Sequence, residues 1–212
     1  MRRTLTCAVT WLLSLVSAAS AETIALGSGL LCSGIPSDQF EQSVGTESRR
    51  QEQSEWCWAA CIQMVLGCHG IDASQSDIVR RVYGRAINRT AGPLEMLAAL
   101  EGDWLNRAGG VSRVRAVPQV LDEHEIVADL DARRPLIAGL MLDGFNGHAC
   151  VLTAATFARD AWGRPRIQSV ILRNPWPWDE FGRPTERNLV ELSWRELLSR
   201  CIFLTRVSVE PL

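Results

Sequence analysis

The sequence predicts an α+β domain in which a helical N-terminal lobe, containing a buried helix, packs against a C-terminal antiparallel β-sheet lobe. Between residues 56 and 100, apolar residues recur with helical spacing and are interrupted by glycine and proline. From residue 136 onward, short apolar runs alternate with stretches rich in turn-forming residues, as expected of strands. Helices first and strands later is the order typical of the α+β class.

The N-terminus has the layout of a secretory signal peptide, residues 1–21. Arg2 and Arg3 precede an apolar run over residues 5–16, and small residues then lead to Ala21. The run is too short to span a membrane comfortably, and no later segment is long and apolar enough to do so. We therefore expect cleavage near Ala21, a secreted or periplasmic mature protein, and no stable membrane insertion.

The rest of the chain divides into an arm and one domain. Residues 22–48 are polar and rich in Gly and Ser, which predicts an irregular N-terminal arm before a domain over residues 49–212. The formal net charge of -2 gives no reason to expect a nucleic-acid partner. An oxidising compartment permits disulfides, and the sequence leaves their pairing open among Cys32, Cys61, Cys68, Cys150 and Cys201.

Three helices are predicted in the first half of the domain. The first covers about residues 56–67 and has almost no polar face, so it should be buried. Ser74 can cap the second helix, with Asp77 at its third position. The third helix begins at Gly92-Pro93, with proline in its first turn.

The second half is predicted to be mostly sheet. It begins with an amphipathic segment over residues 122–134. The expected strands are residues 136–142, 148–157, 167–173, 189–192 and 201–209. Turns are expected at residues 143–147 and 162–165, and a helical turn at residues 194–198.

Cys57 stands at the start of the first predicted helix, where a polar stretch gives way to the apolar run. The N–H groups of a helix's first turn lack intrahelical partners, and the helix dipole favours negative charge there. Both effects lower the pKa of a thiol and raise its thiolate fraction. Cysteine is also common in protein cores, so its position alone does not make Cys57 a nucleophile. The chain must also supply a base that can accept the thiol proton.

The sequence offers three histidines as that base. His69 follows Cys57 by twelve residues on the same helix, which separates the two by roughly 18 Å at about 1.5 Å per residue. His124 lies in a charged run typical of a solvated helix face. His148 opens an apolar strand, where its ring can stand at a sheet edge. By elimination, His148 is the predicted base.

A third side chain should orient the imidazole, and Asn174 is the candidate. It ends the next apolar strand, and neighbouring antiparallel strands can bring its amide oxygen to the His148 ring. Trp176 can shield that hydrogen bond from water. Asp179 is the competing orienter, but it lies in a loop.

An oxyanion hole needs preorganised donors aimed at the developing negative charge. The backbone N–H of Cys57 is one candidate. The side-chain amide of Gln51 or of Gln53 is the other, and the chemistry alone does not choose between them.

Three blocks of sequence stand in the order found in one known family. Gln51 lies six residues before Cys57-Trp58, Gly147-His148-Ala149 opens a strand, and Asn174-Pro175-Trp176 ends the following one. With these blocks the chain resembles papain-like cysteine proteases. It looks most like the compact bacterial branch that includes staphopains and secreted effector proteases of plant pathogens.

The resemblance implies a papain-like fold over residues 49–212 and a thiol endopeptidase that acts on protein or peptide substrates without a cofactor. It implies that Cys57 forms an acyl-thioester, His148 acts as acid and base, Asn174 orients His148, and Gln51 is the oxyanion donor. Two departures stand out. Glu55-Trp56 occupy the place where papain has a small residue and a further cysteine, and the effector branch often has aspartate in place of Asn174.

Two other functions remain open from the sequence. One is a small bacterial Cys-His amidase or peptidase of the cell wall. The other is a catalytically silent secreted binding module, which the eight tryptophans would suit. A metal site is not expected, because one helix carrying Cys57, Cys61, Cys68 and His69 cannot surround an ion tetrahedrally. The oligomeric state is left open.

Overall fold

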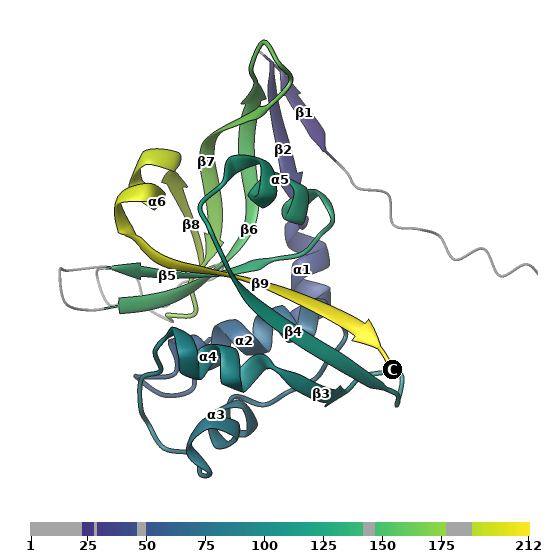
Figure 1. Cartoon of the computed structure of the whole chain (residues 1–212), viewed down its shortest axis with the longest axis vertical. Coiled ribbons are helices and arrows are strands. Elements are labelled where there is room, and N and C mark those ends of the chain that lie inside the picture. The colour runs from purple at the N-terminus through teal and green to yellow at the C-terminus, as the bar shows by residue number, and fades with distance from the viewer. Residues whose placement is uncertain (1–22, 28, 46–49, 142–146, 177–187) are drawn as a thin grey trace, which may run out of the picture.

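The computed structural model describes residues 23–27, 29–45, 50–141, 147–176 and 188–212, and it confirms the predicted α+β class. In these residues, six helices pack on a nine-stranded antiparallel sheet (Figure 1). The sheet follows the order β1-β2-β6-β5-β9-β4-β3, and β7 and β8 continue from β6.

The helical lobe is built around α2 (Cys57–Cys68). This helix contacts β5, β6 and three other helices, and nearly all of its side chains are buried, as predicted. α3 (Gln75–Tyr83) begins at Ser74, whose hydroxyl accepts a hydrogen bond from the Asp77 N–H in the predicted cap. α4 (Pro93–Leu100) carries proline at its start, also as predicted.

The centre of the sheet lies between two hydrophobic cores. It consists of β5 (Leu136–Met141), β6 (Gly147–Arg159) and β9 (Cys201–Pro211). Ile137 and Val151 pack with the helical lobe, whereas Ala138 and Leu152 belong to the core on the opposite face. Both faces are therefore covered, which explains why β5 and β6 are nearly continuous apolar runs in the sequence.

The opposite face is covered by two helices, α5 (Glu123–Asp131) and α6 (Trp194–Arg200). Here β7 (Pro165–Arg173) pairs with β6, and β8 (Leu189–Ser193) pairs with β7. Both helices and all four strands from β5 to β8 lie close to their predicted positions.

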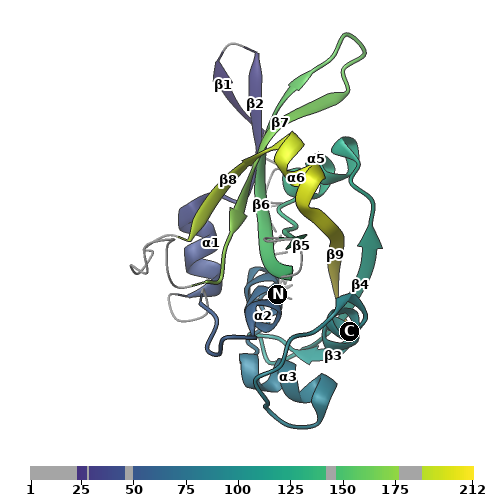
Figure 2. The same cartoon turned by 90° about the vertical axis from the view of Figure 1, so that its left-hand side faces the viewer.

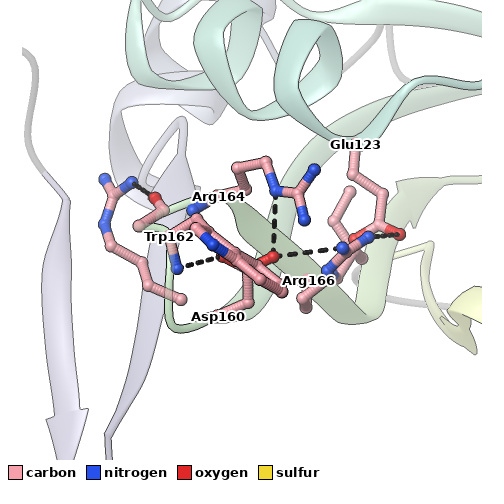
Figure 3. Close-up of polar contacts among 8 residues, drawn as sticks. Glu123, Asp160, Trp162, Arg164 and Arg166 are labelled. Carbon is pink, nitrogen blue, oxygen red and sulfur yellow. Dashed lines mark hydrogen bonds and ion pairs between the residues drawn. The ribbon is translucent and has the colours of Figure 1, made fainter.

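The β6–β7 hairpin turns at the predicted place, and Asp160 organises it (Figure 3). One carboxylate oxygen accepts the backbone N–H groups of Trp162 and Arg164, and the other pairs with the guanidinium groups of Arg164 and Arg166. Glu123 at the start of α5 accepts the Ile167 N–H, so the hairpin is tied to that helix. Figure 2 shows this hairpin and the β1–β2 hairpin extending from the same end of the molecule.

The N-terminal segment is not the irregular arm predicted from its composition. It contains β1 (Ile24–Gly27), β2 (Leu30–Gly34) and α1 (Ser37–Val44). β2 pairs with β6 over four residues and approaches it closely at Gly34, where a Cβ atom would lie 2.4 Å from the Thr153 carbonyl oxygen. The expectation failed because both strands are short and their glycines, needed for turns and close approach, read as loop.

Two further strands were not predicted: β3 (Gly102–Leu105) and β4 (Val111–Gln119). In β4, every second residue is buried, and these positions are occupied by Ser112, Val114 and Ala116. Small or polar residues on the buried face leave too little apolar alternation for a strand to be recognised.

Some predictions fall outside the described residues. These are the signal peptide over residues 1–21, most of the turn at residues 143–147, and Asp179. Within the described residues, no helix has the length and apolar character needed to cross a membrane.

Candidate active site

The start of α2 is locked to the chain that precedes α4. Trp56, the residue before the helix, is buried and donates its indole N–H to the Ile87 carbonyl at 2.8 Å. The Trp58 indole likewise donates to the Arg89 carbonyl at 3.0 Å. The two tryptophans therefore fix the position of Cys57, which stands between them at the first helical residue. This contact also accounts for Trp56, which had no counterpart in papain.

Two opposing influences act on the Cys57 sulfur. Burial raises the pKa of the thiol, and the nearby Glu55 carboxylate raises it further. Hydrogen bonds from the backbone N–H groups of Ala149, Trp58 and Cys57 itself lower the pKa. These N–H groups would stabilise a thiolate once it forms. The contact with Ala149 also shows that the sulfur lies against β6, at the residue that follows His148.

His148, the second residue of β6, is held by Asn174, which follows β7. The distance between His148 Nε2 and Asn174 Oδ1 is 2.7 Å. The same Asn174 oxygen accepts the backbone N–H of Trp176 at 2.9 Å. Because a backbone N–H can only donate, this second bond fixes which amide atom is the oxygen. His148 Nε2 must then carry the proton, which leaves Nδ1 as the basic nitrogen of the neutral ring.

The His148 pKa reflects its half-buried position. Burial lowers the pKa, and the hydrogen bond to Asn174 partly opposes this by favouring the protonated ring. The pKa shifts of Cys57 and His148 both favour the neutral side chains. A neutral thiol beside a neutral imidazole is a competent starting state for general-base catalysis.

Cys57, His148 and Asn174 line one cavity of about 800 Å³ between the two lobes. One wall comes from the segment before α4 and from α4 itself, including Pro93 and Met96. The other comes from the strands and includes Phe203. Gly139 makes room for that ring, because a Cβ atom there would lie 1.9 Å from it. The cavity is large enough to hold several residues of an extended peptide.

Gln51 occupies a buried position beside the site but is not among the residues that line the cavity. Its side-chain Nε2 donates to the carbonyls of Gln53 and Ser54, each at 2.8 Å. Its backbone N–H donates to the Pro175 carbonyl at 3.0 Å, which ties the loop before Cys57 to the loop that carries Asn174. Gln53, the alternative oxyanion donor, is exposed.

Gln75 is a site-supporting residue that the sequence did not reveal. Its fully buried side chain accepts the Glu52 N–H at 2.9 Å and donates to the Arg50 carbonyl at 2.7 Å. It therefore holds the backbone on both sides of Gln51. The contact spans more than twenty residues of chain and depends on how α3 packs on α2, so no local sequence signal marks it.

The other sequence candidates lie away from this cavity. His69 follows the last residue of α2, at the opposite end of the helix from Cys57, and His124 is exposed on α5. All six cysteines in the described part of the chain are free thiols.

The chain is similar to a known protein family and to solved structures. The family model described as papain-like cysteine protease AvrRpt2 matches residues 39–179. Among solved structures, the peptidase domain of Streptococcus ComA, a bifunctional ABC transporter involved in a quorum-sensing pathway, matches with a TM-score of 0.49 and 15% identity. That match covers 77% of this chain and 96% of the ComA chain. No curated protein matches.

The family match spans about two thirds of the chain and includes the segments that carry Cys57, His148 and Asn174. The α+β architecture, with a buried helix carrying a cysteine at its start, is the fold expected of such an enzyme. The protein belongs to the AvrRpt2 family of papain-like cysteine proteases.

Proposed function

We propose that the mature protein is an exported endopeptidase that cleaves peptide bonds with Cys57 as nucleophile, His148 as acid and base, and Asn174 as orienter. The observation that carries this proposal is the 2.7 Å hydrogen bond between His148 and Asn174 beside the cavity that Cys57 lines. A carboxamide oxygen bound to Nε2 leaves Nδ1 to exchange a proton with the thiol. This is the division of roles that a Cys-His nucleophile requires.

The proposed reaction has two halves. His148 Nδ1 takes the thiol proton as the sulfur attacks the substrate carbonyl, and the carbonyl oxygen becomes an oxyanion. When the carbon–nitrogen bond breaks, His148 returns the proton to the leaving amine, and the acyl group stays on sulfur as a thioester. Water, deprotonated by His148, then attacks the thioester, which releases the acid and restores the thiol.

The oxyanion is proposed to be stabilised by the Cys57 backbone N–H and the Gln51 side chain. Both Nε2 hydrogens of Gln51 are directed at loop carbonyls, so one of these bonds must be released before Gln51 can donate to an oxyanion. If Gln51 acts on the transition state, Gln51→Ala should lower kcat by about 10²-fold or more with little change in KM, in addition to any Tm lost with its two loop hydrogen bonds. A lower Tm accompanied by a loss of kcat of only about twofold to threefold would instead assign Gln51 to holding the loop.

Export is proposed from the charged and apolar layout of residues 1–21. Mass spectrometry of the protein recovered outside the producing cells should find Glu22 at the mature N-terminus. An intact N-terminus on protein retained in the cytoplasm would contradict this.

The central test compares cysteines at opposite ends of α2. Cys57→Ala should lower kcat/KM on a casein-type substrate by about 10⁴-fold or more, since the nucleophile and its base act as a unit. Cys68→Ala is the matched control and should keep the wild-type rate. Casein cleavage that survives Cys57→Ala would refute the assignment.

Two further readouts exclude the rival functions. A thiol-directed epoxide should label wild-type protein once, at Cys57, and labelling should be lost in His148→Ala. A silent binding module would not label there. A cell-wall amidase would hydrolyse peptidoglycan fragments and leave casein intact.

A further inference from the structure

Glu55 is an acidic residue in the cavity wall, two positions before the nucleophile. Its side chain is partly buried, and within the described residues its carboxylate has no hydrogen bond or ion pair. The surrounding backbone is fixed, because the Glu55 N–H donates to Asn88 Oδ1 at 2.9 Å, and Asn88 in turn donates to the Ser54 hydroxyl at 2.9 Å. The carboxylate is therefore held at the cavity by a well-anchored loop.

This charge opposes catalysis, because it disfavours the thiolate of Cys57. Arg200, at the end of α6, is the one arginine among the described residues that line the cavity, and it is the positive charge to compare with Glu55. No ion pair joins Arg200 to Glu55, although both side chains are described by the structure. In the part of the chain that the structure describes, the cavity thus presents a negative charge beside the nucleophile that takes part in no hydrogen bond or ion pair.

We propose that Glu55 is a specificity-determining residue that selects substrates with an arginine or lysine side chain at a position adjacent to the scissile bond. The inference rests on the proposed endopeptidase function. A basic side chain would pair with the waiting carboxylate and, at the same time, remove its opposition to the thiolate. A neutral side chain would leave the carboxylate desolvated without a partner, and an acidic one would add repulsion.

The test uses purified full-length mature enzyme and a set of fluorogenic peptides that differ at one residue. Arg, Met or Glu is placed at each of the two positions flanking the scissile bond, which is located by mass spectrometry of the products. The wild type should prefer Arg over Met by about tenfold in kcat/KM at one of these positions, as expected of a partly desolvated ion pair.

Glu55→Gln should bring the Arg and Met peptides to within about twofold of each other, because the amide removes the charge and keeps the shape. Glu55→Arg should favour the Glu peptide. Glu52→Gln is the matched control: Glu52 belongs to the same loop but is exposed and does not line the cavity. That variant should keep the wild-type preference.

A second readout separates electrostatics from folding. The rate of iodoacetamide alkylation of Cys57, measured against pH without substrate, should move to lower pH in Glu55→Gln and stay unchanged in Glu52→Gln. An enzyme that cleaves the peptides without preferring Arg, or a Glu55→Gln variant that keeps the preference, would overturn the inference and leave the protease function standing. A wild type that cleaves no peptide and does not label at Cys57 would overturn the proposed function itself.

Discussion

The two ends of α2 both hold buried ionisable side chains, but only the N-terminal end faces the cavity. There, backbone N–H groups reach the sulfur of Cys57, and Asn174 holds the ring of His148. At the C-terminal end, burial raises the pKa of Cys68 to about 12 and lowers the pKa of His69 to about 4. A cysteine and a histidine thus lie at each end, in different surroundings.

The comparison shows that burial is the largest influence at the C-terminal end: the Arg173 and Arg107 guanidinium groups lower the pKa of Cys68, but desolvation still raises it to about 12. The C-terminal end of a helix favours a cation by about 1 kcal/mol. The shift of the His69 pKa from 6.5 to about 4 corresponds to roughly 3 kcal/mol in the opposite direction. Desolvation, reinforced by the nearby Arg134 guanidinium, therefore outweighs the dipole and keeps His69 neutral. Cys57 and His148 differ from it in having hydrogen-bond partners and in lining the cavity.

The largest effect expected from this difference is selective thiol labelling. At pH 7.5, iodoacetamide should modify Cys57 at least about 100-fold faster than Cys68, because burial raises the pKa of Cys68 to about 12 and leaves very little thiolate there. Peptide mapping after timed quenching would give both rates from one sample. Comparable rates at the two sites would show that the N-terminal end of α2 provides no activation.

The next effect concerns acid stability and isolates the C-terminal end. His69 has a folded-state pKa near 4 and a value near 6.5 when unfolded, so the unfolded chain binds more protons between these pH values. Stability is therefore lost as pH falls through this window. In His69→Gln, the difference in unfolding free energy between pH 7 and pH 4 should be smaller by roughly 3 kcal/mol.

Urea denaturation at the two pH values measures this difference directly. His124→Gln is the control, since His124 is exposed, and it should respond to pH like the wild type. If both variants lose the same stability on acidification as the wild type, His69 is not held neutral by burial.

The sequence predicted the elements that a local pattern encodes, and it missed the contacts that arise only when distant elements pack together. The buried helix and the central strands follow from apolar runs, and the meeting of His148 with Asn174 follows from their places at ends of neighbouring strands. β4 was missed because Ser112 and Ala116 occupy its buried face. The contacts of Gln75 and of the Ala149 N–H depend on packing between elements distant in the chain, which no local pattern encodes. Spacing selected Gln51 over Gln53, but its hydrogen-bond partners required coordinates.

The smallest of these effects concerns Asn174. The direction in which its variants shift the pH profile of kcat/KM is more informative than the size of the rate loss. Asn174→Ala should lower kcat/KM by about 10- to 30-fold, less than His148→Ala, because an orienting group transfers no proton.

Burial lowers the pKa of His148 from 6.5 and the Asn174 hydrogen bond raises it, so removing that bond should move the acid limb of kcat/KM to lower pH. Asn174→Asp should move the limb the other way, because a carboxylate stabilises the protonated ring. Profiles of kcat/KM between pH 4 and 9 would report these shifts for the Cys57–His148 pair as a unit. Identical acid limbs in all three proteins, or a loss in Asn174→Ala equal to that in His148→Ala, would reduce Asn174 to a structural role.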